Sequence, residues 1–343
     1  MGNVYTKSGA LAQKIYFGSV LIWEKLVGSE FIIEVDTTKA GTSNNDQFQF
    51  TGAEGDYDVI AKQNNIVVAT FNDLSGEQTI TLPSSGIYVL EVTPKETNGF
   101  NRISFSNGGD KLKITDIKQW GDVIWSSFER TFSGCENMLV TATDAPDLSS
   151  VTSMYRMFRG ATSANPDTLN WEVSNVTDMR SMFESASSAN PDVSNWNVSS
   201  VTNMGRMFLS ATSANPDVSN WNLSSVTNMS LMFYQATSAN PDTLNWNVSS
   251  VTNMDRMFYQ ASSANPDVSN WDVSSVTDMY SMFNKSGLTS TNLTLIYENW
   301  SQLTLQMDVL FSVGGIKYNS SGQAGRDILI NTYNWSITDG GQV

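Results

Sequence analysis

Residues 190–214 read NPDVSNWNVSSVTNMGRMFLSATSA, and this unit recurs through the middle of the 343-residue chain. When the copies are aligned on Val-Thr-x-Met, a first Met recurs every 25 residues without insertion. A second Met follows three residues later, and a Phe comes directly after it. A strict period of this length is typical of proteins whose successive units stack. The first Met residues are Met154, Met179, Met204, Met229, Met254 and Met279.

Within one unit, apolar residues at helical spacing predict a short helix over 201–210. These residues are Val201, Met204, Met207, Phe208 and Ala211. Asn190-Pro191-Asp192 marks a turn, because Pro cannot donate a backbone hydrogen bond and Asn and Asp bond to nearby backbone. The stretch 193–198 fits a short strand. The expected fold is therefore an α/β repeat solenoid of strand-plus-helix units whose Met, Phe and Trp rows form the core.

One Asp per unit follows the Pro of each turn. A stacked row of carboxylates could bind calcium, but each unit offers only this Asp and no further acidic loop. We therefore expect the Asp residues to cap turns, with calcium as the alternative, and we expect no metal site or cofactor elsewhere. The row consists of Asp167, Asp192, Asp217, Asp242 and Asp267.

The composition excludes several function classes. The chain has no His, which removes Ser-His-Asp and Cys-His mechanisms and the commonest catalytic zinc sites. A net charge of −15 argues against nucleic acid as a partner. Cys135 is the single cysteine, so no intramolecular disulfide can form. No apolar stretch is long enough for a membrane span, and the N-terminus lacks the pattern of an export signal.

The repeat resembles the BspA-like (DUF285-type) surface-protein repeats, which are related to leucine-rich repeats. The motif Val-Ser-Ser-Val-Thr-Asn-Met-x-x-Met-Phe, as at 198–208, carries this resemblance, although Ala-Asn-Pro-Asp stands where the family usually has Phe-Asn-Gln-Asp. The segment 120–138, with Cys135 as a small buried residue, resembles the degenerate first repeats of such proteins. The resemblance implies an LRR-like fold and adhesion, with no catalytic residues to carry over.

The regions that flank the repeat are expected to be a β-domain and a cap. Residues 28–118 alternate apolar and polar residues between turn signals, which predicts a small all-β sandwich and resembles a PKD-like domain. Residues 286–343, with helices expected over 288–302 and 326–331, are similar to C-terminal caps of the same family. The solenoid itself is assigned to 119–285.

Residues 1–27 contain two short apolar strands around Gly18-Ser19, which predicts a hairpin. Such a hairpin needs a surface to pack on, either the following β-domain or another protein. The segment also resembles a hairpin found near the starts of tailed-phage virion proteins, which implies a role in virion attachment. The candidate attachment residues are Ile15, Tyr16, Phe17, Val20, Leu21, Ile22 and Trp23.

The combined expectation is a non-enzymatic bacteriophage protein, in the tail or on the capsid, present in several symmetric copies. Its N-terminal segment would bind other virion proteins, and its repeats would bind a host-surface glycan or protein. The alternatives are a bacterial cell-surface adhesin and, less favoured, a glycan depolymerase with paired carboxylates. The candidate ligand-binding residues lie at variable helix positions: Tyr155, Arg156, Arg159, Arg180, Arg206, Tyr234, Asp255, Arg256, Tyr259 and Tyr280.

Overall fold

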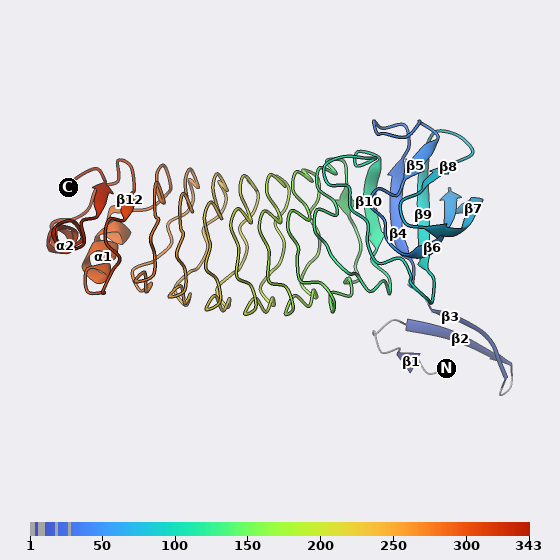
Figure 1. The fold of residues 1–343 in the computed structure, drawn as a ribbon, viewed down its shortest axis with the longest axis horizontal. Coiled ribbons are helices and arrows are strands. Elements are labelled where there is room, and N and C mark those ends of the chain that lie inside the picture. Colours follow the sequence, from blue (N-terminus) through green and yellow to red (C-terminus); the bar gives the residue numbers. More distant parts are fainter. Residues whose placement is uncertain (1–3, 6–10, 18–19, 27–28) are drawn as a thin grey trace.

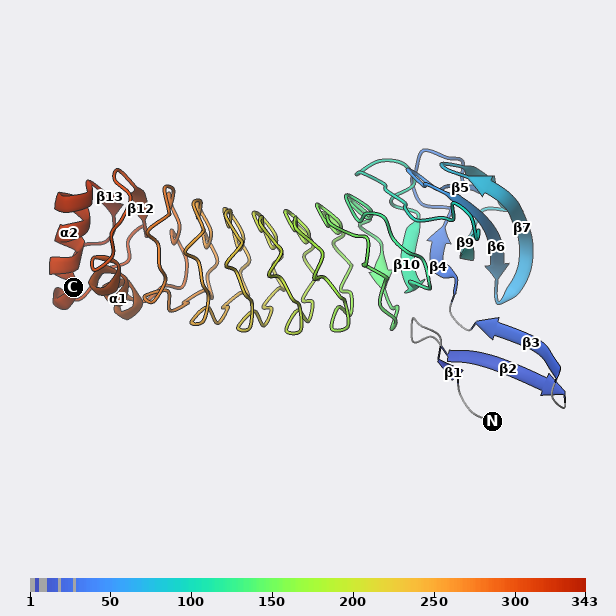
Figure 2. The ribbon, with the colours of Figure 1, turned by 60° about the horizontal axis from the view of Figure 1, so that its bottom comes forward.

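The computed structural model describes residues 4–5, 11–17, 20–26 and 29–343. Residues 29–343 form an elongated body with a β-rich part at one end, a row of stacked coils in the middle and two helices at the far end (Figure 1). The turned view in Figure 2 shows the same succession. The repeat region thus separates the two ends of the chain.

The β-rich part is built on one mixed six-stranded sheet in the order β11-β10-β4-β9-β6-β7. Residues 102–105 form no strand of this sheet, and Arg102 makes only an isolated bridge to Glu54. The strands are β4 (Phe31–Asp36), β6 (Asp56–Gln63), β7 (Ile66–Ser75), β9 (Ile87–Pro94), β10 (Ile114–Gln119) and β11 (Leu139–Val140).

The expected sandwich of two sheets is therefore wrong for this region. Only a two-stranded ribbon, β5 (Gln47–Gln49) with β8 (Thr79–Thr81), accompanies the large sheet. Phe50, which follows β5, contacts Tyr57 of β6 at 5.3 Å between ring centroids. The alternation of apolar residues was correct, since β4 buries every second side chain, but alternation does not reveal how strands divide between sheets.

The N-terminal strands are antiparallel, as expected. They are β1 (Val4–Tyr5), β2 (Leu11–Phe17) and β3 (Val20–Leu26), in the order β1-β2-β3. Ile15 lies opposite Trp23, and Phe17 lies opposite Val20. The expected turn at Gly18-Ser19 lies outside the described residues.

The repeat region corrects the predicted fold class. Residues 141–285, all of which the structure describes, contain no helix and no strand beyond isolated parallel bridges such as that between Asp178 and Asn203. The expected α/β solenoid of strand-plus-helix units, LRR-like, is therefore wrong. Instead, residues 126–285, here called the coil stack, form successive coils made of turns (Figure 1).

The direction of the backbone hydrogen bonds explains why no helix forms. The N–H groups of Met179, Ser181 and Phe183 donate to carbonyls of the next coil at 2.9–3.0 Å. Ser181 takes a positive φ of 55°, outside the range of a right-handed helix. Met182 N–H bonds back three residues to Met179, as in a β-turn. An apolar spacing of three fits such turns as well as it fits a helix, so the periodicity was ambiguous.

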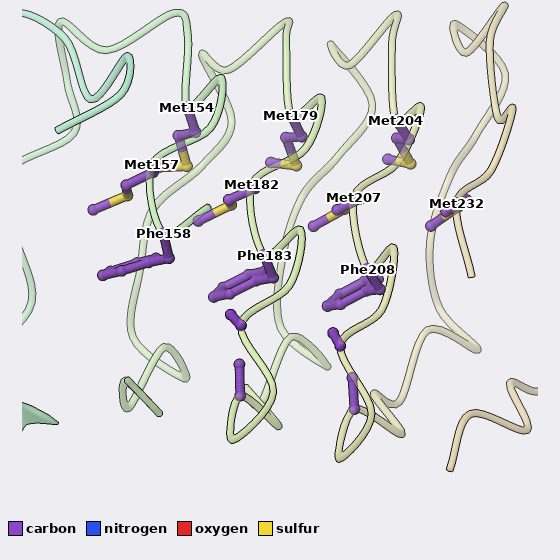
Figure 3. Close-up of a cluster of buried hydrophobic side chains, with 14 of the residues drawn as sticks. Met154, Met157, Phe158, Met179, Met182, Phe183, Met204, Met207, Phe208 and Met232 are labelled. Atoms are coloured by element: carbon purple, nitrogen blue, oxygen red, sulfur yellow. The ribbon is translucent and has the colours of Figure 1, made fainter. Parts of the chain in front are cut away.

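The core of the coil stack consists of rows of identical side chains. Figure 3 shows Met154, Met179 and Met204 in one row, with the second Met and the Phe of each coil below them. Successive Phe rings from Phe158 to Phe283 stack with centroids 5.3–5.6 Å apart. Trp221 Nε1 donates to the Val193 carbonyl of the preceding coil at 3.2 Å. Each coil therefore buries its apolar face only by contact with its neighbours.

Polar side chains also bond from coil to coil. The Asn of the first four Asn-Pro-Asp turns accepts the N–H of the corresponding Asn in the next coil, as Asn190 does from Asn215 at 2.8 Å. The last, Asn265, accepts the Thr289 N–H of the cap instead. Asp217 caps its own turn instead, accepting the N–H and hydroxyl of Ser219 at 3.1 and 2.7 Å. These Ser219 hydrogen bonds hold the pKa of Asp217 below its usual value. The turn-capping interpretation of the Asp row is thus confirmed.

The C-terminal segment covers the last coil. It contains α1 (Ser290–Trp300), β12 (Leu310–Ser312), the short η1 (Ser320–Gly322), α2 (Gln323–Tyr333) and β13 (Ser336–Thr338). Phe311 of β12 bridges to Met279, and Trp300 Nε1 donates to the Val268 carbonyl at 3.1 Å. The cap therefore continues the backbone pairing and the Trp hydrogen bonds of the coils.

Candidate functional site

Three variable positions of the repeat follow the first Met closely. Two of them stand one and two residues after it, between the two buried Met residues, and the third stands five residues after it, directly behind the buried Phe. We call these positions the outer strip. It consists of residues 155, 156 and 159 and the residues at intervals of 25 from them, up to 280, 281 and 284. All ten predicted ligand-binding residues belong to it.

Four of these residues gather around a cavity of about 250 Å³ in the first coils of the repeat, here called the basic hollow. The Arg156 and Arg180 guanidiniums lie 4.8 and 4.7 Å from the centroid of the Tyr155 ring. Asp178 pairs with Arg180 at 2.7 Å, and these hydrogen bonds raise the pKa of Arg180. The hollow is lined by Tyr155, Arg156, Arg180, Ser181, Gly205, Arg206, Asn228 and Ser230.

Three more predicted residues line a second cavity, here called the acidic hollow, of about 550 Å³ near the cap. Arg256 pairs with Asp255 at 3.0 Å and lies over the Tyr280 ring at 4.8 Å. Burial raises the pKa of Asp255, and nearby Asp278 raises it further against the effect of Arg256. The lining is Asp255, Arg256, Thr277, Asp278, Tyr280, Asp308 and Leu310. The cavity near the cap is thus acidic because Asp278 and Asp308, which lie outside the strip, join Asp255, whereas the cavity in the first coils is basic.

The remaining predicted residues lie at the third position of the strip. Tyr234 and Tyr259 stack in parallel at 5.0 Å between centroids. Arg159 is paired with Glu184 through Nε, at 3.0 Å from a carboxylate oxygen. The predicted residues therefore form three separate groups and one ion pair.

Sequence reasoning missed two features of this surface. The Arg130 guanidinium also lies over the Tyr155 ring, 5.3 Å from its centroid. It corresponds to Arg156 with a spacing of 26, which an alignment of Phe132-Ser-Gly with Phe158-Arg-Gly would have revealed. Gln235 donates to Gln260 at 2.6 Å beside the Tyr pair. Such amide rows carry no sequence signal beyond their repetition.

The described residues show no arrangement suited to a metal ion. No group of three or more His, Cys, Asp or Glu among them is placed to hold one. Cys135 is fully buried, and burial raises the pKa of its thiol. None of the helices in the described part is long and apolar enough to cross a bilayer.

The model of a known protein family matches the coil stack and the first part of the C-terminal cap. The family model described as "Mycoplasma protein of unknown function, DUF285" matches residues 126–245 and 211–313, which together span more than half of the chain. The chain belongs to the DUF285 family. This confirms the resemblance of the repeats to the BspA-like type, and DUF285 membership is consistent with a BspA-like surface protein. Searches of curated proteins and of solved structures give no match.

The DUF285 match does not extend to the N-terminal strands. The likeness of residues 14–23 to phage virion hairpins, and the attachment role of Ile15 to Trp23, stay predictions.

Proposed function

We propose that this DUF285 protein is a non-catalytic binding protein displayed on a biological surface, with the outer strip as its contact face. The observation that carries the proposal is the division of the repeat between constant and variable positions. The first Met, the second Met and the Phe are the same in all six copies and are buried. The outer strip differs from coil to coil while the backbone beneath it stays regular.

The chemistry of the strip favours recognition. Arg and Tyr are enriched among residues that dominate binding energies, because they offer large contact area and several donors. Here they stand on a backbone fixed by coil-to-coil hydrogen bonds, so little ordering is required on binding. The proposed partner is a surface glycan or a surface protein.

Exchanging strip residues for those that other repeats carry tests the proposal. In the strip variant, Arg156 and Arg206 become Ser, and Tyr234 and Tyr259 become Asn, as at positions 181 and 284. We expect binding to intact cells and to extracted envelope polymers to weaken at least tenfold, since several charged and aromatic contacts are lost together. Sedimentation with cells and surface plasmon resonance would measure this.

The matched control changes exposed residues outside the strip. Leu169→Ser with Leu244→Ser introduces the residue found at 194 and 219, and binding should stay within about twofold because hot spots are few. Equal losses in both variants would refute the strip as the contact face. Chain shortening of a bound glycan, seen by size-exclusion chromatography, would instead indicate a depolymerase.

The finer proposal is that the surface is a bacteriophage particle, to which residues 1–27 attach the chain through other virion proteins, in several copies. Its support is the likeness of the β2–β3 segment to virion hairpins. Mass spectrometry of purified particles should detect the chain in stoichiometric amount. Its absence from particles, with presence in bacterial cell-wall fractions, would favour the bacterial adhesin.

A further inference from the structure

The basic hollow exists because one coil lacks a side chain where the other coils have one. Gly205 occupies a position held elsewhere by Tyr155, Arg180, Ser230, Asp255 and Tyr280. A Cβ atom placed on Gly205 would lie 3.3–3.4 Å from Asn203, Asn228 and Ser230, so small polar groups surround the space. The opening is thus specific to this coil. It is bordered by the Asn228 amide and the Ser230 hydroxyl, which can donate, and by Asn203 Oδ1, which already accepts the Gly205 N–H.

The charges around the hollow are unbalanced in favour of cations. Its lining contains three Arg and no Asp or Glu. Arg206 is exposed and has no ion-pair partner among the described residues. The Nε–H of Arg156 is buried and has no acceptor in the described part of the chain. Only Arg180 is paired, to Asp178 through both carboxylate oxygens.

The neutral groups of the lining are hydrogen-bond donors as well. Asn228 Oδ1 accepts the Ser230 N–H at 2.9 Å, which leaves the Asn228 amide N–H groups to donate near Gly205. Ser181 and Ser230 add hydroxyls. Guanidinium, amide and hydroxyl donors around a small space match the several acceptor lone pairs of an oxyanion. In a chain of net charge −15, the three Arg of this lining form a local excess of positive charge.

We infer that the basic hollow binds the carboxylate or sulfate group of an acidic surface polysaccharide. This inference rests on the proposed function and names the class of ligand for one part of the strip. An acidic protein segment fits less well, because the Tyr155 ring is covered by guanidiniums and no aliphatic side chain lines the cavity. Protein interfaces bury apolar and aromatic cores, whereas sugars present hydroxyls to donors and acceptors such as these.

Two variants of the full chain test the inference. Arg206→Ser introduces the residue that the equivalent positions 181 and 281 carry. Ser181 and Ser281 have a positive φ, as Arg206 does, so the backbone of the coil is retained. Gly205→Tyr fills the hollow with the residue of positions 155 and 280 and leaves every charge in place. We expect each to weaken binding of hyaluronan or dextran sulfate at least tenfold, because a charge-assisted contact is lost or blocked. Isothermal titration calorimetry with both polymers separates carboxylate from sulfate as the preferred group.

The matched control is Lys285→Ser, which removes one positive charge from an exposed position of the coil stack outside the outer strip. It introduces the residue found at the equivalent positions 185 and 210, both of which also have a positive φ. Its affinity should stay within about twofold of the original. Equal losses of affinity for Arg206→Ser and Lys285→Ser would show that the overall charge of the chain, and not the hollow, determines binding, and would overturn the inference. Unchanged affinity of Gly205→Tyr would overturn it as well. Equal affinity for poly-glutamate or for neutral dextran would overturn it too.

The failure of this inference is distinguishable from failure of the proposed function. In one outcome, the protein binds cells, the strip variant does not, and Arg206→Ser keeps its affinity for both polymers. The outer strip is then the contact face, and the inference of an anion site is wrong. If the hollow binds acidic polymers but cells are bound equally by the strip variant, the anion site holds and the contact face is wrong.

Discussion

Replacing Phe208 by Ala is expected to lower the free energy of unfolding by about 3–5 kcal/mol, the usual cost of removing a buried aromatic side chain. Phe208 is fully buried in the middle of the coil stack. Its ring lies 5.6 Å from Phe183 and 5.5 Å from Phe233, almost parallel to both. The substitution thus removes two stacking contacts and leaves a cavity between coils. Urea titration followed by circular dichroism would measure the loss.

The control for this variant is Leu244→Ala. Leu244 belongs to the same repeats but is 51% exposed, so its removal should change stability by no more than about 0.5 kcal/mol. A Phe208→Ala loss below about 1 kcal/mol would contradict the buried Phe row.

Lys113→Met is expected to cost a similar amount, about 3–5 kcal/mol, by leaving a buried charge without its partner. Lys113 and Asp110 are both fully buried, with Nζ 3.4 Å from a carboxylate oxygen. Lys113 also donates to the Asn44 and Gln47 carbonyls at 2.8 and 2.9 Å, fixing the loop before β5. Thermal unfolding followed by calorimetry would record the loss, as a transition of the β-rich part.

The electrostatics of Asp110 show why the pair matters. Burial by itself raises the pKa of Asp110, but hydrogen bonds from Ser43 and Gln49 and the charge of Lys113 outweigh it, so the pKa lies below its usual value. Asp110 is therefore ionised in the folded chain and needs its counter-charge.

The control for Lys113→Met is Lys39→Met. Lys39 is exposed, and its Nζ lies 4.0 Å from an Asp36 carboxylate oxygen, so the two charges form a weak surface pair. We expect its loss to change the free energy of unfolding by no more than about 0.5 kcal/mol. Equal effects of the two variants would contradict the importance of burial.

The sequence revealed the period of the repeat and its buried residues, but not the backbone between them. The residues Met204, Met207 and Phe208 were correctly placed in the core. Their spacing could not distinguish a helix from consecutive turns, because both return a side chain to the same face after about three residues. The choice is made by hydrogen bonds to the next coil, which no single unit encodes.

In the candidate site, too, the sequence revealed which residues matter but not how they are grouped. Variable Arg and Tyr residues could be identified as outward-facing, yet their grouping depends on contacts across coils, such as Arg180 lying over Tyr155. The hollow beside them was not predictable from conspicuous residues, because it is created by Gly205, where a side chain is missing. Nor does the sequence distinguish the two Asn residues of a unit, of which Asn190 forms the inter-coil bonds and Asn195 is exposed.

The coil-to-coil rows have a consequence for how the molecule could change in length. Since each coil presents the next one with the same Met, Phe, Trp and Asn partners, a whole unit of 25 residues can be duplicated or removed without creating a new interface. Each such event would change the separation between the β-rich end and the cap by about 4.8 Å, the spacing of neighbouring paired backbones. The reach of the molecule therefore changes in whole-unit steps when units are gained or lost, while the fold of every coil is preserved.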